Sequence, residues 1–537
     1  MIAPHPGTRP LLLLRFSDYW LDNAVTALDS GPKPMTTSTL AQPQTAGAAG
    51  RLIVSVNWRV IGQAVAVFAL FAALFAGVQF ATPGIADNDG YYHIKLAQLI
   101  REQGLKPAFV WLPLTILGRD AFYDHHLLYH IFLTFFARGD LTLGAKLAAV
   151  VAPALAFAAI WWLLRGQGVR WASIWAMGLF AVSQAFLYRM SMPRAQAASL
   201  LVLALGMHWM LHRRYRLLIP LGFFYVWLYN AFPLLLMMGV LYVAAAFLTE
   251  RRIEWRALVY PAMGMGLGLV INPYFPQNIT FIVSHIAPKI GESTISVGNE
   301  WYPYETWTLV ENSGFALAAF LLGALALGWR GRRIDRPTLM AFFTAIAFGY
   351  MLFKSRRFVE YYPAFALIFA ALSAAPAIEN WLSRRARSAP AILMAALVVP
   401  LVITLGDARG AMARSKPADL YAGASIWLRE HTPPGSMVFQ TDWDDFTRLF
   451  FYNTSNLYTL GLDPTYMELY DADLYNTWVR ITQGKIERPG DIIRSRFGGE
   501  YVMSDLDHTA FLAKAKDDPG LKEVYRDKYA VIFQLVD

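Results

Sequence analysis

Residues 59–93 read RVIGQAVAVFALFAALFAGVQFATPGIADNDGYYH, and this stretch decides what kind of protein the chain is. Its first part, residues 59–80, contains no acidic residue and a single arginine at its start. A helix of about 20 apolar residues is long enough to cross the hydrocarbon core of a membrane. We therefore expect residues 59–80 to span a membrane. Two aspartates, Asp87 and Asp89, follow just beyond the expected membrane border.

Similar apolar runs recur along the chain and alternate with short, charged loops. Hydrophobic residues make up 56% of the sequence and charged residues only 16%, whereas soluble domains carry about 25% charged residues. The sequence predicts an α-helical polytopic membrane protein with about eleven spans. For residues 216–248, where Pro233 closely follows Asn230, one long broken helix is the alternative to two spans. The expected spans are 59–80, 143–164, 171–187, 195–211, 216–230, 231–248, 257–272, 312–329, 337–353, 360–377 and 390–406.

The basic residues indicate how the chain is oriented. If the N-terminus lies in the cytoplasm, five short basic loops fall on the cytoplasmic side, as the positive-inside bias requires. These loops are Arg165–Arg170, His212–Arg216, Glu250–Arg256, Trp329–Arg336 and Ser383–Arg387. The net charge of +9 thus reflects topology, and we expect no nucleic-acid partner. The chain has no cysteine, which excludes disulfides and metal sites with cysteine ligands.

The sequence divides into three parts. Residues 1–50 lack the pattern of a signal peptide and resemble a flexible tail, in which Met35 offers an alternative start. Residues 51–407 form the expected transmembrane domain, with long outer loops at 81–142 and 273–311. Residues 408–537 are more charged and mix helix and strand patterns, so we expect a small soluble α/β domain on the outer face.

The first outer loop carries two groups of candidate functional residues. Asp87 and Asp89 can bind a divalent cation through oxygen ligands or act as a base. Alternatively, Asp87 caps the following helix and Asp89 favours its first turn. Asp124, His125 and His126 offer one carboxylate and two imidazoles, a set that favours a transition metal such as Mn²⁺ or Zn²⁺. For the two histidines, hydrogen bonding to the backbone is the alternative.

The second outer loop and the expected soluble domain contribute acidic residues beside aromatic ones. Glu300 lies close to Trp301 and other aromatic residues that suit contact with a sugar or peptide. The alternative is an aromatic belt at the membrane interface. Trp443, Asp444 and Asp445 follow an expected strand and form a candidate acceptor site, or else a polar turn.

Two short outer loops carry four arginines, against the positive-inside bias. Arginine makes bidentate contacts to phosphate, so these residues are candidates for binding the phosphate of a lipid-linked sugar. Attraction to lipid headgroups is the alternative explanation. The four are Arg189, Arg194, Arg356 and Arg357.

This combination resembles the glycosyltransferase-C superfamily, and most of all the catalytic subunits of oligosaccharyltransferases. The stretch from Asp87 to Tyr91 is similar to the Asp-x-Asp-like motif that follows the first span in that family. The stretch from Ile295 to Glu300 is similar to a Thr/Ser-Ile/Val-x-Glu motif with longer spacing, and Trp443-Asp444 matches the centre of a Trp-Trp-Asp-Tyr-Gly motif. One departure is clear: where the family has a second acidic motif, this chain reads Arg194-Ala195-Gln196.

The resemblance implies an inverting glycosyltransferase in a multi-pass inner membrane protein of a bacterium. The donor is a sugar or oligosaccharide on polyprenyl phosphate or pyrophosphate, and the acceptor is a glycan, lipid or protein. Asp89 is the base or a carboxylate bound to Mn²⁺ or Mg²⁺, Glu300 orients the acceptor, and the outer arginines hold the donor phosphate. The alternatives are a lipid or glycolipid flippase without chemistry and a membrane-anchored assembly protein.

Overall fold

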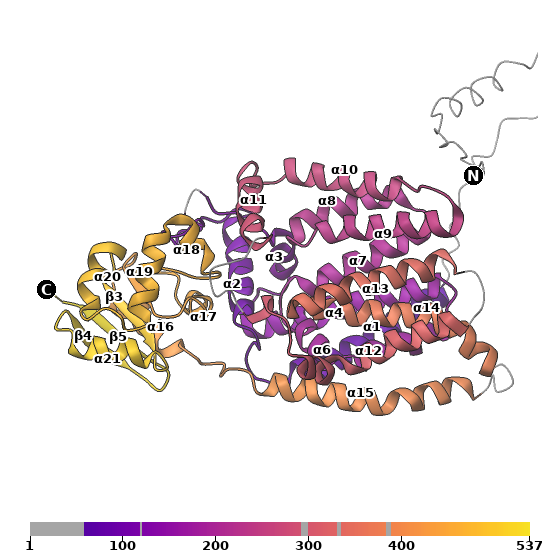
Figure 1. Ribbon diagram of the computed structural model, residues 1–537. Helices are drawn as coiled ribbons and strands as arrows, with labels where there is room; N and C mark the ends of the chain where they lie inside the picture. The colour runs from indigo at the N-terminus through magenta and orange to yellow at the C-terminus, as the bar shows by residue number, and fades with distance from the viewer. Residues whose placement is uncertain (1–57, 119–120, 291–298, 330–333, 383–387, 537) are drawn as a thin grey trace, which may run out of the picture. The chain divides into compact units, whose positions relative to one another are not determined.

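The computed structural model describes residues 58–118, 121–290, 299–329, 334–382 and 388–536. The expected tail at 1–50 and the loop at 383–387 lie outside these residues, as does most of the stretch from Ile295 to Glu300. The first part of the described chain is helical, and the last part is a mixed domain built around a sheet (Figure 1). We call the elements from α16 to β5 the C-terminal domain.

Seven described helices are long and apolar enough to cross a membrane, so the protein is an integral membrane protein. Three shorter apolar stretches, Gln196–Leu211, Tyr215–Leu228 and Arg256–Val270, lie among them. The seven are α1 (Trp58–Gln79), α4 (Leu141–Gly166), α9 (Pro233–Glu250), α12 (Thr306–Trp329), α13 (Arg336–Lys354), α14 (Tyr362–Leu382) and α15 (Ala389–Ala413).

One expected span is broken. Residues 171–187 contain the short helix α5 (Ala172–Met177), the 3₁₀ turn η1 (Gly178–Phe180) and the start of α6 (Gln184–Met190). Ser183 has an extended backbone and caps α6 by accepting a hydrogen bond from the Phe186 amide at 3.1 Å. A serine in this position starts a new helix. Hydropathy alone did not reveal this break, because the residues on both sides of it are apolar.

The region of residues 216–248 forms two helices rather than one. Helix α8 (Leu218–Leu228) ends before Tyr229, whose backbone is extended, and Pro233 is the first residue of α9. Proline favours the first turn of a helix, where its missing amide hydrogen costs nothing. This break places Tyr229 at the end of a membrane helix, where it becomes part of the site described below.

Helices α8 and α10 (Arg256–Val270) pack closely through glycines. A Cβ at Gly264 would overlap the carbonyl oxygen of Ile219, and a Cβ at Gly222 would lie 2.5 Å from the carbonyl oxygen of Pro261. Small residues at such positions let helix backbones approach each other within a membrane.

The two long loops contain helices of their own. The first loop holds α2 (Asn88–Gln103) and α3 (Leu127–Thr134), and the second holds α11 (Gln277–Ile290) and the 3₁₀ turn η3 (Asn299–Trp301). Asp87 occupies the position before α2 but makes no side-chain cap. Its carboxylate is instead paired with an arginine far along the chain, so the capping interpretation of Asp87 is wrong.

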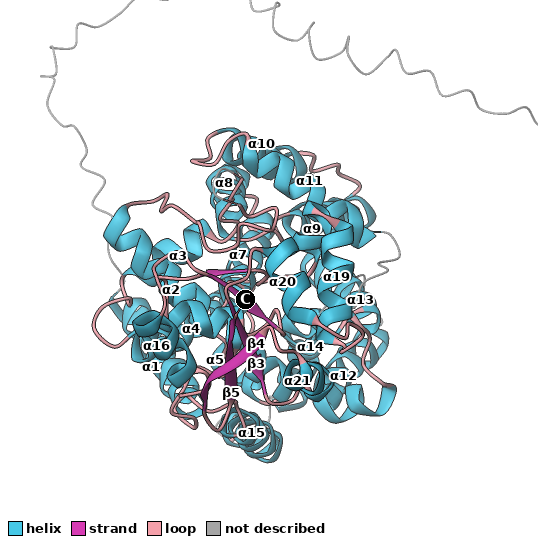
Figure 2. Ribbon diagram, turned by 90° about the vertical axis from the view of Figure 1, so that its left-hand side faces the viewer, coloured by secondary structure: helices cyan, strands magenta, loops and turns pink. Residues whose placement is uncertain are grey.

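The C-terminal domain contains a five-stranded mixed sheet with the order β2-β1-β3-β5-β4. Strand β1 is parallel to β2 and β3, and β5 is antiparallel to β3 and β4. The strands are β1 (Met437–Gln440), β2 (Leu457–Tyr458), β3 (Tyr501–Asp505), β4 (Leu521–Arg526) and β5 (Ala530–Leu535). The helices are α16 (Ala422–His431), α17 (Phe446–Tyr452), α18 (Thr465–Tyr470), α19 (Ala472–Thr482), α20 (Pro489–Phe497) and α21 (Thr509–Asp517). Figure 2 looks onto this domain and shows the strands together, with helices around them.

Candidate active site

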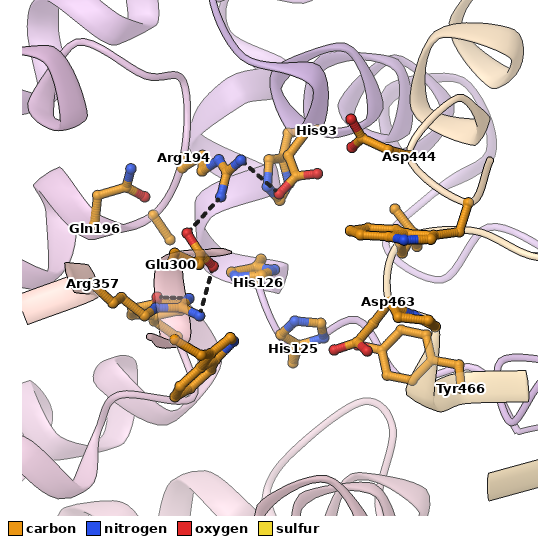
Figure 3. A pocket seen from close by; sticks show the side chains of 17 residues that line it. His93, His125, His126, Arg194, Gln196, Glu300, Arg357, Asp444, Asp463 and Tyr466 are labelled. Atoms are coloured by element: carbon orange, nitrogen blue, oxygen red, sulfur yellow. Dashed lines mark hydrogen bonds and ion pairs between the residues drawn. The ribbon is translucent and has the colours of Figure 1, made fainter. Parts of the chain in front are cut away.

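A cavity of about 320 Å³ lies where the C-terminal domain meets the loops of the membrane domain. The membrane domain contributes α2, the turn before α7 (Gln196–Leu211), η3 and the 3₁₀ turn η4 (Arg356–Glu360). The C-terminal domain contributes the loop after β1 and the segment that leads into α18. Figure 3 shows Arg194, Glu300 and Arg357 on one side of the cavity and Asp444, Asp463 and Tyr466 on the other.

The start of α2 is held tightly against the turn that carries Arg194. A Cβ at Gly90 would overlap the ring of Pro193, so only glycine permits this approach. The approach places Asp87 and Asp89 beside the Arg194 guanidinium, although 107 positions separate Asp87 from Arg194 in the sequence.

Arg194 pairs with carboxylates from two segments of the chain. Its Nε and one terminal nitrogen donate to the two carboxylate oxygens of Asp87, a bidentate pair. The same terminal nitrogen lies 3.1 Å from Asp89 Oδ2, and the other lies 3.7 Å from Glu300 Oε2. Bidentate pairing with carboxylate is among the strongest contacts that arginine makes, and it fixes the guanidinium plane.

Glu300 is the centre of a second network. Its Oε2 lies 2.8 Å from Arg189, and its Oε1 accepts a hydrogen bond from Arg357 at 3.1 Å. Burial opposes ionisation of Glu300, but Arg357, Arg189 and Arg194 outweigh it and hold the pKa of this carboxyl well below its usual range. Glu300 is therefore a fixed anion and not a proton carrier.

Asp89 has the opposite character. Its side chain remains 30% exposed and lines the cavity. Burial raises the pKa of Asp89 to about 7; Arg194 opposes the rise, while the negative charge of Asp87 adds to it. A carboxylate with a pKa near neutrality is suited to accept a proton in a reaction.

Three histidines line the cavity, and a buried chain of hydrogen bonds orients one of them. The carboxylate of Asp124 accepts a hydrogen bond from His130 Nδ1 at 2.7 Å, and His130 Nε2 lies 2.7 Å from His93 Nδ1. Burial, with His130 adding to it, lowers the pKa of His93 well below its usual value. His93 is therefore neutral.

The hydrogen bonds around His130 also bear on the residues suggested as metal ligands, Asp124, His125 and His126. Asp124 is buried and does not line the cavity; it accepts from His130 and from the His126 amide at 3.0 Å. His125 and His126 do line the cavity, and the His126 ring stacks on Tyr229. The structure thus does not bring the three together as one set of ligands.

The C-terminal domain supplies an aromatic and acidic wall. Trp443, Asp444, Asp463 and Tyr466 line the cavity, whereas Asp445 is buried away from it. Asn88 at the start of α2 joins this wall to the membrane domain, because its side-chain nitrogen donates to Asp444 and its oxygen accepts from Arg448 Nε at 2.9 Å.

Of the four arginines suggested as phosphate ligands, two line the cavity and two do not. Arg194 and Arg357 line the cavity. Arg189 lies behind them, where it pairs with Glu300 and the buried Glu360. Arg356 points elsewhere and donates to the Pro303 carbonyl at 3.2 Å.

Several lining residues were not among those suggested from the sequence, namely His93, Gln196, Tyr229, Asp463 and Tyr466. His93 ends the stretch that begins the first loop, so its place beside two aspartates was a usable signal. Tyr229 gave none, since a tyrosine at the end of a membrane helix is common. Tyr466 gave none either, because it is one of several tyrosines in the C-terminal domain.

Carboxylates and imidazoles line the cavity, but within the described part of the chain no three of their ligand atoms converge on one point there. Among the residues that the structure describes, one group, Asp442, Asp505 and His508, has three ligand atoms within 4.8 Å of one another. None of these three lines the cavity. Two of the carboxylates in the cavity wall, Asp89 and Glu300, are instead paired with arginines, which compete with a divalent cation for their oxygens.

No family model matches the chain. A curated relative, the dolichyl-phosphooligosaccharide-protein glycotransferase 3 of Archaeoglobus fulgidus, is 28% identical over 249 residues. This match covers 38% of the present chain and 28% of the relative, so the aligned part spans less than a third of that protein.

Solved structures match over most of the chain. The A. fulgidus oligosaccharyltransferase AglB, solved with an inhibitory peptide and a dolichol-phosphate, has a TM-score of 0.63 at 15% identity, covering 89% of this chain and 75% of that one. ArnT from Cupriavidus metallidurans, bound to undecaprenyl phosphate, has a TM-score of 0.55 at 16% identity, covering 88% and 98%. An A. fulgidus oligosaccharyltransferase structure with Zn and sulfate has a TM-score of 0.60 at 14% identity, covering 87% and 73%. The chain therefore shares the fold of these structures, as its resemblance to the glycosyltransferase-C superfamily predicts.

Proposed function

We propose that the protein is a membrane glycosyltransferase. It transfers a sugar or oligosaccharide from a polyprenyl-phosphate or polyprenyl-pyrophosphate donor to a glycan, lipid or protein acceptor. The observation that carries the proposal is the cavity itself, which combines a carboxylate of near-neutral pKa, Asp89, with a fixed arginine, Arg357, at the border of the membrane domain. The polyprenyl phosphates bound by structures of the same fold support this class of donor.

Arg357 is the best candidate to hold the donor phosphate. Its guanidinium is positioned by Glu300 at 3.1 Å, by the Tyr229 hydroxyl and by the Trp301 ring, whose centre lies 4.9 Å away. Arginine has five N–H donors, so the bonds to Glu300 and Tyr229 leave donors for a phosphate oxygen. Glu300 thus acts by positioning Arg357 and the neighbouring arginines, and we assign it no proton transfer.

The acceptor lies against the wall formed by the C-terminal domain. Trp443 and Tyr466 offer flat apolar faces, and Asp444 and Asp463 offer hydrogen-bond acceptors. In the reaction the acceptor heteroatom forms a bond to the anomeric carbon, and the bond from that carbon to the phosphate oxygen breaks. Asp89 takes the proton of the acceptor, and the phosphate leaves as an anion beside Arg357. Direct displacement inverts the anomeric carbon.

The resemblance also implies Mn²⁺ or Mg²⁺. We route no step of the reaction through such an ion, because Asp87 and Asp89 are paired with Arg194. The expected setting is the inner membrane of a bacterium, with the cavity and the C-terminal domain on the outer face. This orientation rests on the five basic loops of the sequence.

A deletion strain tests the function. Mass spectrometry of surface glycans, glycolipids and glycoproteins should reveal a missing product, while the lipid-linked donor accumulates unchanged in the outer leaflet. Wild-type protein should restore the product and Asp89→Asn should not. Asp473→Asn is the matched control, because Asp473 is exposed on α19 and paired only with residues of the C-terminal domain.

The same experiment separates the enzyme from a flippase. A flippase would leave the lipid-linked sugar in the inner leaflet, and Asp89→Asn would then have no specific effect on the product. An unchanged set of glycans and a normal amount of lipid-linked donor in the deletion strain would contradict both functions.

A further inference from the structure

We infer that the guanidinium of Arg194 takes the place of a divalent cation in this cavity, so that its carboxylates work without a bound metal. The inference adds detail to the proposed function. Only its prediction about turnover depends on that function. It concerns Arg194 in particular, because the guanidinium of this residue contacts carboxylates from two loops.

The position of Arg194 is that of a central cation. One guanidinium contacts Asp87 through two bonds, Asp89 at 3.1 Å and Glu300 at 3.7 Å. These carboxylates come from two loops that are far apart in the sequence. A metal ion in such a site would join the same loops by the same kind of contact.

The guanidinium is part of the fold. Its side chain is 18% exposed, and the turn that carries it is closed by a hydrogen bond from the Arg194 amide to the Met192 carbonyl at 2.8 Å. Pro193 in this turn packs against Gly90 of α2. The backbone of Arg194 is therefore held beside the start of α2.

The charges around Arg194 are already close to balance. Arg189, Arg194 and Arg357 supply three positive charges, and four carboxylates pair with them, namely Asp87, Asp89, Glu300 and Glu360. A divalent ion bound to Asp89 or Glu300 would lie beside these guanidinium groups and be repelled by them. The carboxylates of Asp89 and Glu300 point toward the arginines, and among the described residues no group of three ligand atoms converges in the cavity.

Removing the arginine should reveal the position as a cation site. In Arg194→Ala, Asp87, Asp89 and Glu300 lose their shared counter-charge and face one space. We expect this variant to bind one more Mn²⁺ per chain than the wild type, measured by electron paramagnetic resonance on purified protein. The additional ion should disappear in the double variant Arg194→Ala/Asp89→Asn. Binding at Asp442, Asp505 and His508 would be common to all variants and cancels in the difference.

Matched variants keep the result interpretable. Arg170→Ala removes an arginine that pairs with Glu379 at 2.9 Å on the exposed surface, and it should gain no ion. If Arg194→Ala does not fold, Asp89→Asn in the wild-type chain remains a test, because it keeps the shape of the side chain. Loss of a Mn²⁺ ion in that single variant would show that the wild-type cavity holds a metal and would overturn the inference. Failure of a folded Arg194→Ala protein to gain an ion would overturn it as well.

Turnover provides a second measurement. The wild-type enzyme should keep its rate in EDTA, whereas a metal-dependent enzyme would lose it. The Mn²⁺ measurement needs no donor or acceptor, so a wrong assignment of the reaction and a wrong assignment of Arg194 would be distinguished.

Discussion

At the scale of single residues, Asp89 and Glu300 show how the same carboxylate group is given two roles. Glu300 is paired with three arginines and stays ionised. Asp89 contacts only Arg194, which is also paired with Asp87, and burial raises the pKa of Asp89 to about 7. The difference comes from the number of positively charged partners, because the two side chains are exposed to a similar degree.

The pKa of Asp89 predicts how the rate depends on pH. A base must be deprotonated, so kcat/KM should fall by about tenfold for each pH unit below 7 and level off above it. Asp89→Asn should lower kcat by roughly two orders of magnitude or more, and the remaining activity should lose the slope with a midpoint near 7. The control Asp473→Asn should keep both the rate and the profile. A wild-type profile that stays flat from pH 5 to 8 would rule out Asp89 as the base.

Arg357 and Arg356 form a natural pair for testing the phosphate site. Arg357 lines the cavity, whereas its neighbour Arg356 bonds to the Pro303 carbonyl outside it. Lysine keeps the charge but loses the forked geometry. We therefore expect Arg357→Lys to raise the KM for the lipid donor and to leave the acceptor KM nearly unchanged, while Arg356→Lys changes neither. Equal effects of the two variants would indicate general attraction to lipid headgroups.

At the scale of elements, the apolar runs of the sequence were sufficient to predict most of the membrane helices. They could not reveal the break at Ser183, which depends on a cap and on a bond from its hydroxyl to the Asn312 carbonyl at 2.8 Å. The sequence did reveal candidate residues in both long loops, because acidic residues at a membrane border are unusual. It did not reveal their partners, because the pairing of Asp87 with Arg194 depends on how two loops pack.

The packing of α8 against α10 gives a prediction about stability. Gly264→Ala places a methyl group against the backbone of Ile219, which cannot move without shifting α8. Overpacking of this kind costs about 1–3 kcal/mol, so the midpoint of thermal unfolding in detergent should fall. Gly266→Ala, two residues along the same helix, meets nothing within 4 Å and should not lower it. If both variants unfold at the wild-type temperature, the prediction that α8 and α10 pack this closely is wrong.

At the scale of the whole molecule, the site is shared between the membrane domain and the C-terminal domain. Asn88 contacts both Asp444 and the buried Arg448, and Arg448 also donates to the Pro417 carbonyl at 2.9 Å. The sequence indicated both domains, but it could not show that their loops meet in one cavity. That information lies in contacts such as the one between Asn88 and Arg448, which are 360 positions apart.

Because the cavity is shared, the side of the membrane on which the C-terminal domain lies decides where the reaction takes place. The basic loops predict that this domain is outside. A lipid-linked donor suits that side, because a reaction with such a donor requires no nucleotide sugar there. The absence of cysteine makes the prediction easy to measure. A cysteine at the exposed Ser495 of α20 should react with an impermeant maleimide in intact cells. A cysteine at the exposed Arg214, in a basic loop between membrane helices, should react only after the membrane is permeabilised. The reverse pattern would place the cavity in the cytoplasm, where the proposed donor chemistry would have to be abandoned, although the pairing of Arg194 with the carboxylates would stand.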